Sequence, residues 1–152
     1  MKFRYLILIV VFLLTGCVAA PTAEPTPTAV LPYRITPEDN PYAPKTGDVG
    51  MTIGGVTLTS ISLSERFDLT PSRVVVRLLG SMPSVCNELR VEVSLPDAQG
   101  RIFMDVYSLI NKDMDCDNVF QQFEATILLG TYSSGRYTIW INEGLIGDFV
   151  AY

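Results

Sequence analysis

Hydrophobic and polar residues alternate in short segments over the C-terminal two-thirds of the chain, from about residue 47 onward. The clearest segment is 88–95, in which Leu89, Val91, Val93 and Leu95 alternate with polar residues. A period of two is typical of strands that bury one face, and turn residues separate these segments roughly every ten residues. The pattern predicts strands at 56–63, 73–79, 88–95, 101–109, 119–129, 137–141 and 145–152.

Three local features refine the predicted strands. The segment 73–79 is apolar on both faces except at Arg77, which indicates a central strand. The apolar positions change phase within 56–63, which predicts a β-bulge near Ser60. The sequence 142–144, Asn-Glu-Gly, predicts a tight hairpin turn between the last two strands.

About seven strands in roughly 105 residues fit one all-β domain. We expect an antiparallel two-sheet sandwich of immunoglobulin-like type, because strands of this length and spacing pack economically in that way. A partly open barrel is the alternative architecture.

The N-terminus has the pattern of an export signal. Lys2 and Arg4 precede the apolar run 5–14, and small residues follow it. This combination is typical of a secretory signal, and the run is too short to span the roughly 30 Å hydrocarbon core of a bilayer comfortably.

The order Leu14-Thr15-Gly16-Cys17 resembles the lipobox of bacterial lipoproteins. The resemblance implies that the Cys17 thiol receives a diacylglycerol and that the chain is cut before Cys17. Two or three acyl chains anchor a protein stably, whereas one binds only marginally. From the residues alone, an ordinary signal peptide with an incidental cysteine, or an uncleaved short anchor, remains open.

The chain therefore divides into a signal peptide at 1–16, a Pro/Thr-rich tether at 17–46 and a β-sandwich domain at 47–152. Frequent prolines disfavour helix and ladder pairing and favour extended polyproline II or plain disorder. The prolines of the tether are Pro21, Pro25, Pro27, Pro32, Pro37, Pro41 and Pro44.

Composition excludes several classes of function. Loss of Lys2 and Arg4 with the signal lowers the 11 basic residues to nine against 16 acidic ones, a net charge of −7. An acidic chain without a basic cluster is a poor partner for nucleic acid. The chain has no histidine, which excludes Ser-His-Asp and Cys-His catalysis and histidine metal sites. We expect no enzyme activity, no cofactor and no resident metal.

Cys86 and Cys116 remain as an even pair once Cys17 is assigned to the lipid. In an exported domain such a pair predicts a structural disulfide. Two free thiols or a redox pair are the alternatives, although no Cys-x-x-Cys spacing supports redox chemistry.

Acidic residues suggest two further sites, neither of which we favour. Asp113, Asp115 and Asp117, with Glu124 further on, have the spacing of a calcium loop, but Asn118 stands where such a loop needs glycine and Cys116 lies within it. Asp105, Asp115 and Glu124 could pair as carboxylates for glycoside hydrolysis, but their spacing does not make them converge.

Aromatic residues supply the ligand-binding candidate. Trp140, Phe103 and Tyr107 fall on faces of two predicted strands that could point outward, together with Arg101 and Thr138. They would form a platform for a sugar or peptide. The alternative, which we favour from the sequence, is that one or more of them fills the core of the second sheet.

The globular part also resembles a group of small, uncharacterised envelope lipoproteins of bacteria. The matching residues are 80–86 (Gly-Ser-Met-Pro-Ser-Val-Cys), Cys116, Phe123-Glu124, 135–142 (Gly-Arg-Tyr-Thr-Ile-Trp-Ile-Asn) and Phe149. The run before Cys116 is more acidic than the group's pattern. The resemblance implies a disulfide-bonded β-sandwich on a lipid anchor and implies no activity.

From these features we expect a lipid-anchored protein of the cell membrane or envelope, facing outside the cytoplasm. Its noncatalytic domain would bind an envelope protein or glycan, and the lipid on Cys17 would anchor the protein in the membrane. The alternative is a lipid-anchored protease inhibitor that presents its loops at 130–132 and 142–144 to a protease, as cystatin-like and chagasin-like inhibitors do.

The first prediction concerns Cys17. Mass spectrometry of the natural protein should find a chain that begins at Cys17 and carries a diacylglycerol on its thiol. The variant Cys17→Ser should lose the lipid and leave the membrane fraction. A chain that still begins at Met1, or an unmodified cysteine, contradicts the lipoprotein assignment.

Overall fold

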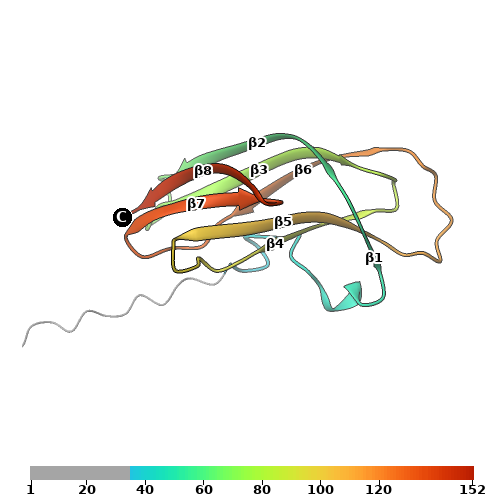
Figure 1. Ribbon diagram of the computed structural model, residues 1–152, viewed down its shortest axis with the longest axis horizontal. Coiled ribbons are helices and arrows are strands. Elements are labelled where there is room, and N and C mark those ends of the chain that lie inside the picture. Colours follow the sequence, from blue (N-terminus) through green and yellow to red (C-terminus); the bar gives the residue numbers. More distant parts are fainter. Residues whose placement is uncertain (1–34) are drawn as a thin grey trace, which may run out of the picture.

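The computed structural model describes residues 35–152, which form a sandwich of two β-sheets (Figure 1). The elements are η1 (Thr46–Asp48), β1 (Thr52–Gly54), β2 (Thr57–Arg66), β3 (Arg73–Met82), β4 (Glu88–Val93), β5 (Arg101–Ile110), β6 (Gln121–Leu128), β7 (Gly135–Ile141) and β8 (Gly144–Ala151). The all-β prediction is confirmed as a two-sheet sandwich, and its immunoglobulin-like type stays a prediction. Within this part of the chain no helix has the length and apolar character to cross a membrane.

The two sheets differ in their strand pairing. The three-stranded sheet has the order β2-β3-β6 and is antiparallel throughout. In the five-stranded sheet, β5 pairs with β4, with β1 and with β7. β1 and β7 pair with different stretches of β5, and β8 pairs with β7. The β5–β7 pair is parallel, which departs from the antiparallel expectation. The pair is parallel because β6 lies between the two strands in the chain and belongs to the other sheet. The chain crosses to that sheet in β6 and then returns, so that β7 runs in the same direction as β5.

The core lies between the facing surfaces of the two sheets. Alternate side chains of each strand point inward, and burial of their apolar area stabilises the domain. The core residues are Val74, Val76, Leu78, Met82, Leu89, Val91, Ile102, Met104, Val106, Ala125, Ile127, Leu129, Ile139, Ile141 and Phe149.

The local predictions hold in detail. β3 is the central strand of its sheet, and its single exposed arginine, Arg77, points away from the core. The register of β2 shifts between Leu58 and Ser60, where the bulge was predicted. Asn142 and Glu143 have φ of 45° and 69°, as a two-residue hairpin turn of this hand requires. The short β1 was not predicted, because three residues are too few to reveal an alternation.

Residues 35–45, which we call the N-terminal strap, lie against the side of the sandwich. The Asn40 side chain donates to the Val91 carbonyl at 2.8 Å, and the Val91 N–H donates to the Tyr42 carbonyl at 2.9 Å. On the other sheet, the Leu128 N–H donates to the Asp39 carbonyl at 2.9 Å. The strap thus joins the open edges of β4 and β6, and the folded body includes residues that the sequence analysis assigned to the tether.

Cys86 and Cys116 form a disulfide with a Cα–Cα distance of 6.0 Å, as predicted. It joins the loop before β4 to the loop between β5 and β6 at one end of the sandwich (Figure 1). Next to it, the buried Asn87 amide donates to the Ser108 hydroxyl at 3.0 Å and accepts from the Ser84 hydroxyl at 2.6 Å. These contacts tie the Cys86 loop to β5.

Removal of the disulfide should destabilise the domain. The sequence separation of 30 residues predicts a loss of about 3.7 kcal/mol for Cys86→Ser/Cys116→Ser on the chain-entropy model. Urea denaturation of the full chain measures this loss, and the reduced wild type should match the variant. An unchanged free energy of unfolding contradicts this role of the bridge.

Candidate functional site

The outer face of the five-stranded sheet carries all three aromatic residues that the sequence singled out. Phe103 and Tyr107 lie on β5 at positions that alternate with the buried Met104 and Val106. Trp140, on β7, is the register partner of Phe103. Among residues 35–152 the core cluster contains none of the three, so the structure contradicts the core alternative that we favoured from the sequence.

We call Phe103, Trp140 and Tyr107 the aromatic platform. Phe103 and Trp140 form its centre. The ring centroids of Phe103 and Trp140 are 6.2 Å apart and the rings are tilted by 37°. The Trp140 indole N–H donates to the Thr138 hydroxyl at 3.1 Å, which fixes the orientation of the ring. The Phe103 side chain keeps 36% of its area exposed, so a ligand can reach it.

One arginine already stacks on the platform. The Arg101 guanidinium carbon lies 5.4 Å from the centre of the Phe103 ring. The same guanidinium pairs with Asp97 at 2.6 Å, and the Asp97 carboxylate also accepts the Gln99 and Arg101 backbone N–H groups. Arg101 lowers the pKa of Asp97, although burial opposes this effect. The turn 97–100 thus holds the cation over the ring.

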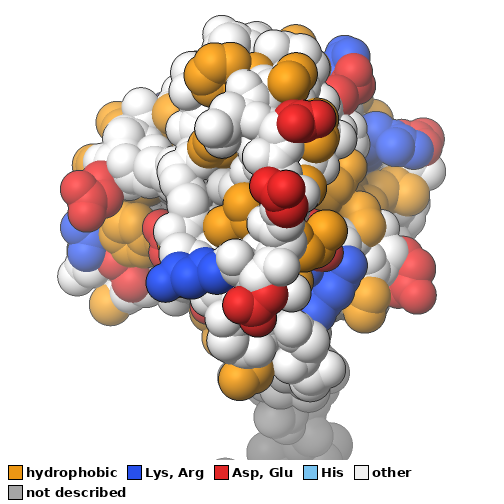
Figure 2. All heavy atoms as spheres, turned by 90° about the vertical axis from the view of Figure 1, so that its right-hand side faces the viewer, with side chains coloured by type: hydrophobic (Ala, Val, Ile, Leu, Met, Phe, Trp, Pro, Cys, Tyr) orange, Lys and Arg blue, Asp and Glu red, His pale blue; other side chains and the backbone are white. Residues whose placement is uncertain are grey.

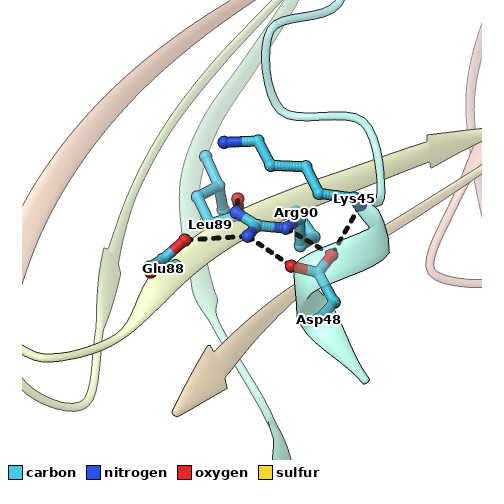
Figure 3. Close-up of polar contacts among 5 residues, drawn as sticks. All are labelled: Lys45, Asp48, Glu88, Leu89 and Arg90. Carbon is cyan, nitrogen blue, oxygen red and sulfur yellow. Dashed lines mark hydrogen bonds and ion pairs between the residues drawn. The ribbon is translucent and has the colours of Figure 1, made fainter. Parts of the chain in front are cut away.

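Figure 3 shows that a second arginine, Arg90, lies beneath η1 at the edge of the same face. Its side chain is only 4% exposed, and it donates to both carboxylate oxygens of Asp48, at 2.6 and 2.8 Å. It also pairs with Glu88 at 2.7 Å. The Lys45 N–H donates to Asp48 as well, at 2.7 Å. The bonds from Arg90 and Lys45 hold the pKa of Asp48 at about 2, below its ordinary value of 3.8.

Glu92 and Asp105 lie directly opposite each other on β4 and β5, beside the platform. Both are exposed, and within the described part of the chain neither forms an ion pair. Their charges reach Tyr107, whose pKa is raised first by burial and then by the negative charges of Glu92, Asp48 and Asp105. The structure therefore places two carboxylates without an ion-pair partner on this face, with Asp105 between Phe103 and Tyr107 along β5 and Glu92 next to it on β4.

The acidic loop between β5 and β6 does not assemble the calcium site suggested by its spacing. Figure 2 faces this end of the molecule and shows acidic side chains interspersed with hydrophobic ones. Asp113, Asp115 and Asp117 are exposed, whereas the Glu124 carboxylate is 2.7 Å from Arg77 on β3. Residues 35–152 contain no group of three or more carboxylates or thiols arranged for a metal ion.

The carboxylates considered for glycoside hydrolysis do not converge. Asp105 points outward from the five-stranded sheet, and Glu124 points outward from the three-stranded sheet. They therefore lie on opposite faces of the sandwich. Asp115 lies in the loop at its end. No pair of these three flanks one bond of a substrate.

The loops of the inhibitor alternative are held against the body. The Asn142 side chain accepts the Val106 N–H at 2.8 Å and donates to the Val106 carbonyl at 3.0 Å, so it continues the ladder of β5. Tyr132 packs against Tyr137 and Phe149, with ring centroids 5.0 and 5.7 Å away. Both loops are thus anchored to the body, although residues 142–144 themselves are exposed.

Sequence reasoning missed Glu92 and Arg90, although the signal for Glu92 was available. Residues 96–100, Pro-Asp-Ala-Gln-Gly, separate the predicted strands 88–95 and 101–109 and have the composition of a turn. Counting back from such a hairpin turn places Glu92 close to Asp105. The burial of Arg90 had no such signal, because its partner Asp48 comes from 42 residues away.

A comparison of the chain with protein-family models, curated proteins and solved structures finds no match.

The depressed pKa of Asp48 predicts an acid-dependent contribution to stability. The Asp48–Arg90 pair should stabilise the fold fully above about pH 4, the ordinary range of an aspartate, and lose this effect as pH falls through about 2. Asp48→Asn should therefore lower Tm at pH 6 and have little effect near pH 2.

Thermal unfolding between pH 2 and pH 7 measures this difference. Asp113→Asn, which removes an exposed loop carboxylate, is the matched control and should shift Tm little at any pH. An Asp48→Asn deficit that stays constant down to pH 2 contradicts the assignment.

Proposed function

We propose that this protein is a lipid-anchored envelope protein whose β-sandwich is a noncatalytic binding or assembly module. The observation that carries the proposal is the aromatic platform, in which Phe103, Trp140 and Tyr107 stay out of the core although each is large and apolar. Aromatic side chains bury much area at low conformational cost, and they are enriched in binding surfaces for that reason.

The lipid anchor in this proposal rests on the sequence. Cys17 and most of the predicted tether lie outside the described residues. In this proposal, residues 18–34 connect the lipid to the strap. A polyproline II segment of that length reaches about 50 Å, enough to hold the platform clear of lipid head groups.

The noncatalytic assignment is supported by the form of the site. The platform is the open face of a sheet, and its carboxylates lie beside rings rather than around a common point. Catalytic groups need convergence on one reacting bond, and the described residues offer no such arrangement at the candidates we considered. The inhibitor alternative gains no specific support, since its loops are held against the body.

Trp140→Ala should weaken capture of the natural partner. Crosslinking and pull-down of the mature protein from its own envelope, followed by protein and glycan analysis, identifies what binds in stoichiometric amounts. A tryptophan at the centre of an interface contributes about 2 kcal/mol, so the variant should bind about 30-fold more weakly.

Phe120→Ala is the matched control, because Phe120 is 71% exposed but lies in the loop between β5 and β6. It should capture as much partner as the wild type. Circular dichroism and Tm must show that both variants are folded. Equal capture by folded Trp140→Ala and wild type would falsify the platform as the binding surface.

A further inference from the structure

The charges of the platform face are unevenly compensated. Three arginines lie on the outer face of the five-stranded sheet, and each already has its own carboxylate: Arg90 with Asp48 and Glu88, Arg101 with Asp97, and Arg136 with Asp148. Glu92 and Asp105, on the same face, have no ion-pair partner among the described residues. Because they are direct cross-strand neighbours, their like charges destabilise the free protein.

Rings flank this negative charge on β5. Phe103, Asp105 and Tyr107 occupy successive outward positions, so a ring, a carboxylate and a second ring follow one another at intervals of about 7 Å. A cation above Asp105 would be attracted by the carboxylates and by the faces of neighbouring rings together. Charge complementarity therefore selects a positively charged ligand for this face.

Guanidinium suits the face better than ammonium. A planar guanidinium pairs with a carboxylate through two parallel hydrogen bonds and stacks on aromatic rings, whereas an ammonium acts as a point charge. Phe103 already accepts the guanidinium of Arg101 at 5.4 Å from its centre. The same ring chemistry is available to a guanidinium from a ligand.

The extent of the face favours a polypeptide over a small molecule. From Trp140 on β7 across β5 to Glu92 on β4, the face spans two strand spacings, roughly 10 Å. Beyond Glu92, between β4 and the strap, lies a groove of about 220 Å³. Its apolar lining residues include Ile35, Pro37, Ala43, Pro44 and Val93. An extended chain can place an arginine over Asp105 and an apolar side chain in this groove.

We infer that the partner of the platform is an arginine-bearing polypeptide segment, whose guanidinium binds the Glu92–Asp105 pair beside the aromatic rings. The inference rests on the proposed function, because it names the chemistry of the ligand at the same site. An acidic, platform-bearing domain would then join the envelope to a basic segment of another protein.

The test is a fluorescence-anisotropy titration of the full-length protein in detergent micelles. The probes are labelled peptides of alternating arginine and glycine, lysine and glycine, and glutamate and glycine. We expect the arginine peptide to bind more tightly than the lysine peptide, the glutamate peptide not to bind, and the affinity to fall with added salt. Cellohexaose serves as the neutral glycan competitor and should not displace the arginine peptide.

Glu92→Gln and Asp105→Asn remove one charge each and keep the shape of the side chain. Each should weaken binding of the arginine peptide about twofold to fivefold, because each variant removes one exposed ion pair. Asp113→Asn removes the same charge from the loop between β5 and β6 and should leave the affinity unchanged. Phe103→Leu should reduce binding of the arginine peptide more than that of the lysine peptide.

Three outcomes overturn the inference: unchanged affinity in both carboxylate variants, an equal loss in Asp113→Asn, or displacement of the arginine peptide by cellohexaose. The proposed function is judged separately, through capture of the natural partner. If that capture depends on Trp140 but not on Glu92 or Asp105, the binding module stands and its arginine ligand is wrong. If it depends on none of them, both proposals fail.

Discussion

The hydrogen-bonded ion pair between Arg90 and Asp48 determines how the N-terminal part of the chain crosses the sandwich. A guanidinium that is 4% exposed must have anionic partners, since an unpaired buried charge costs several kcal/mol. Asp48 supplies two oxygens and can do so only if η1 lies over β4. The chain before η1 is thereby brought to the edge of β4, where the strap forms, and the chain after it is brought to β5, where β1 pairs.

This crossing also decides which part of the five-stranded sheet stays open. η1 covers the face near Arg90, while Phe103, Trp140 and Asp105 further along remain uncovered. The strap covers the edges of β4 and β6 that no strand pairs with. Without it, these edges would offer backbone hydrogen-bonding groups to other chains. The chain's own N-terminal segment therefore covers one side of the sandwich, and the neighbouring face, where the proposed partner would bind, stays uncovered by it.

The platform combines two features that are unfavourable in an isolated domain. Exposed aromatic area is costly to hydrate, and the Glu92–Asp105 pair sets two like charges side by side. The arginines on this face pair with other carboxylates, so none of them neutralises Glu92 or Asp105 and the repulsion between these two charges remains. Both costs would fall if an apolar and positively charged surface covered the platform, and this is the physical basis of the binding role that we propose.

The sequence by itself determined every strand but the short β1, the central position of β3, the bulge at Ser60, the turn at Asn142 and the cysteine pair, because period-two burial, turn chemistry and cysteine count are local properties. It misjudged the aromatic residues, since alternation shows that Phe103 and Met104 face opposite ways but not which of them faces the other sheet. Tertiary structure alone decided the parallel β5–β7 pair, the strap and the burial of Arg90, all of which join residues far apart in the chain. Such contacts depend on how two sheets stack, and no spacing along one strand encodes that arrangement.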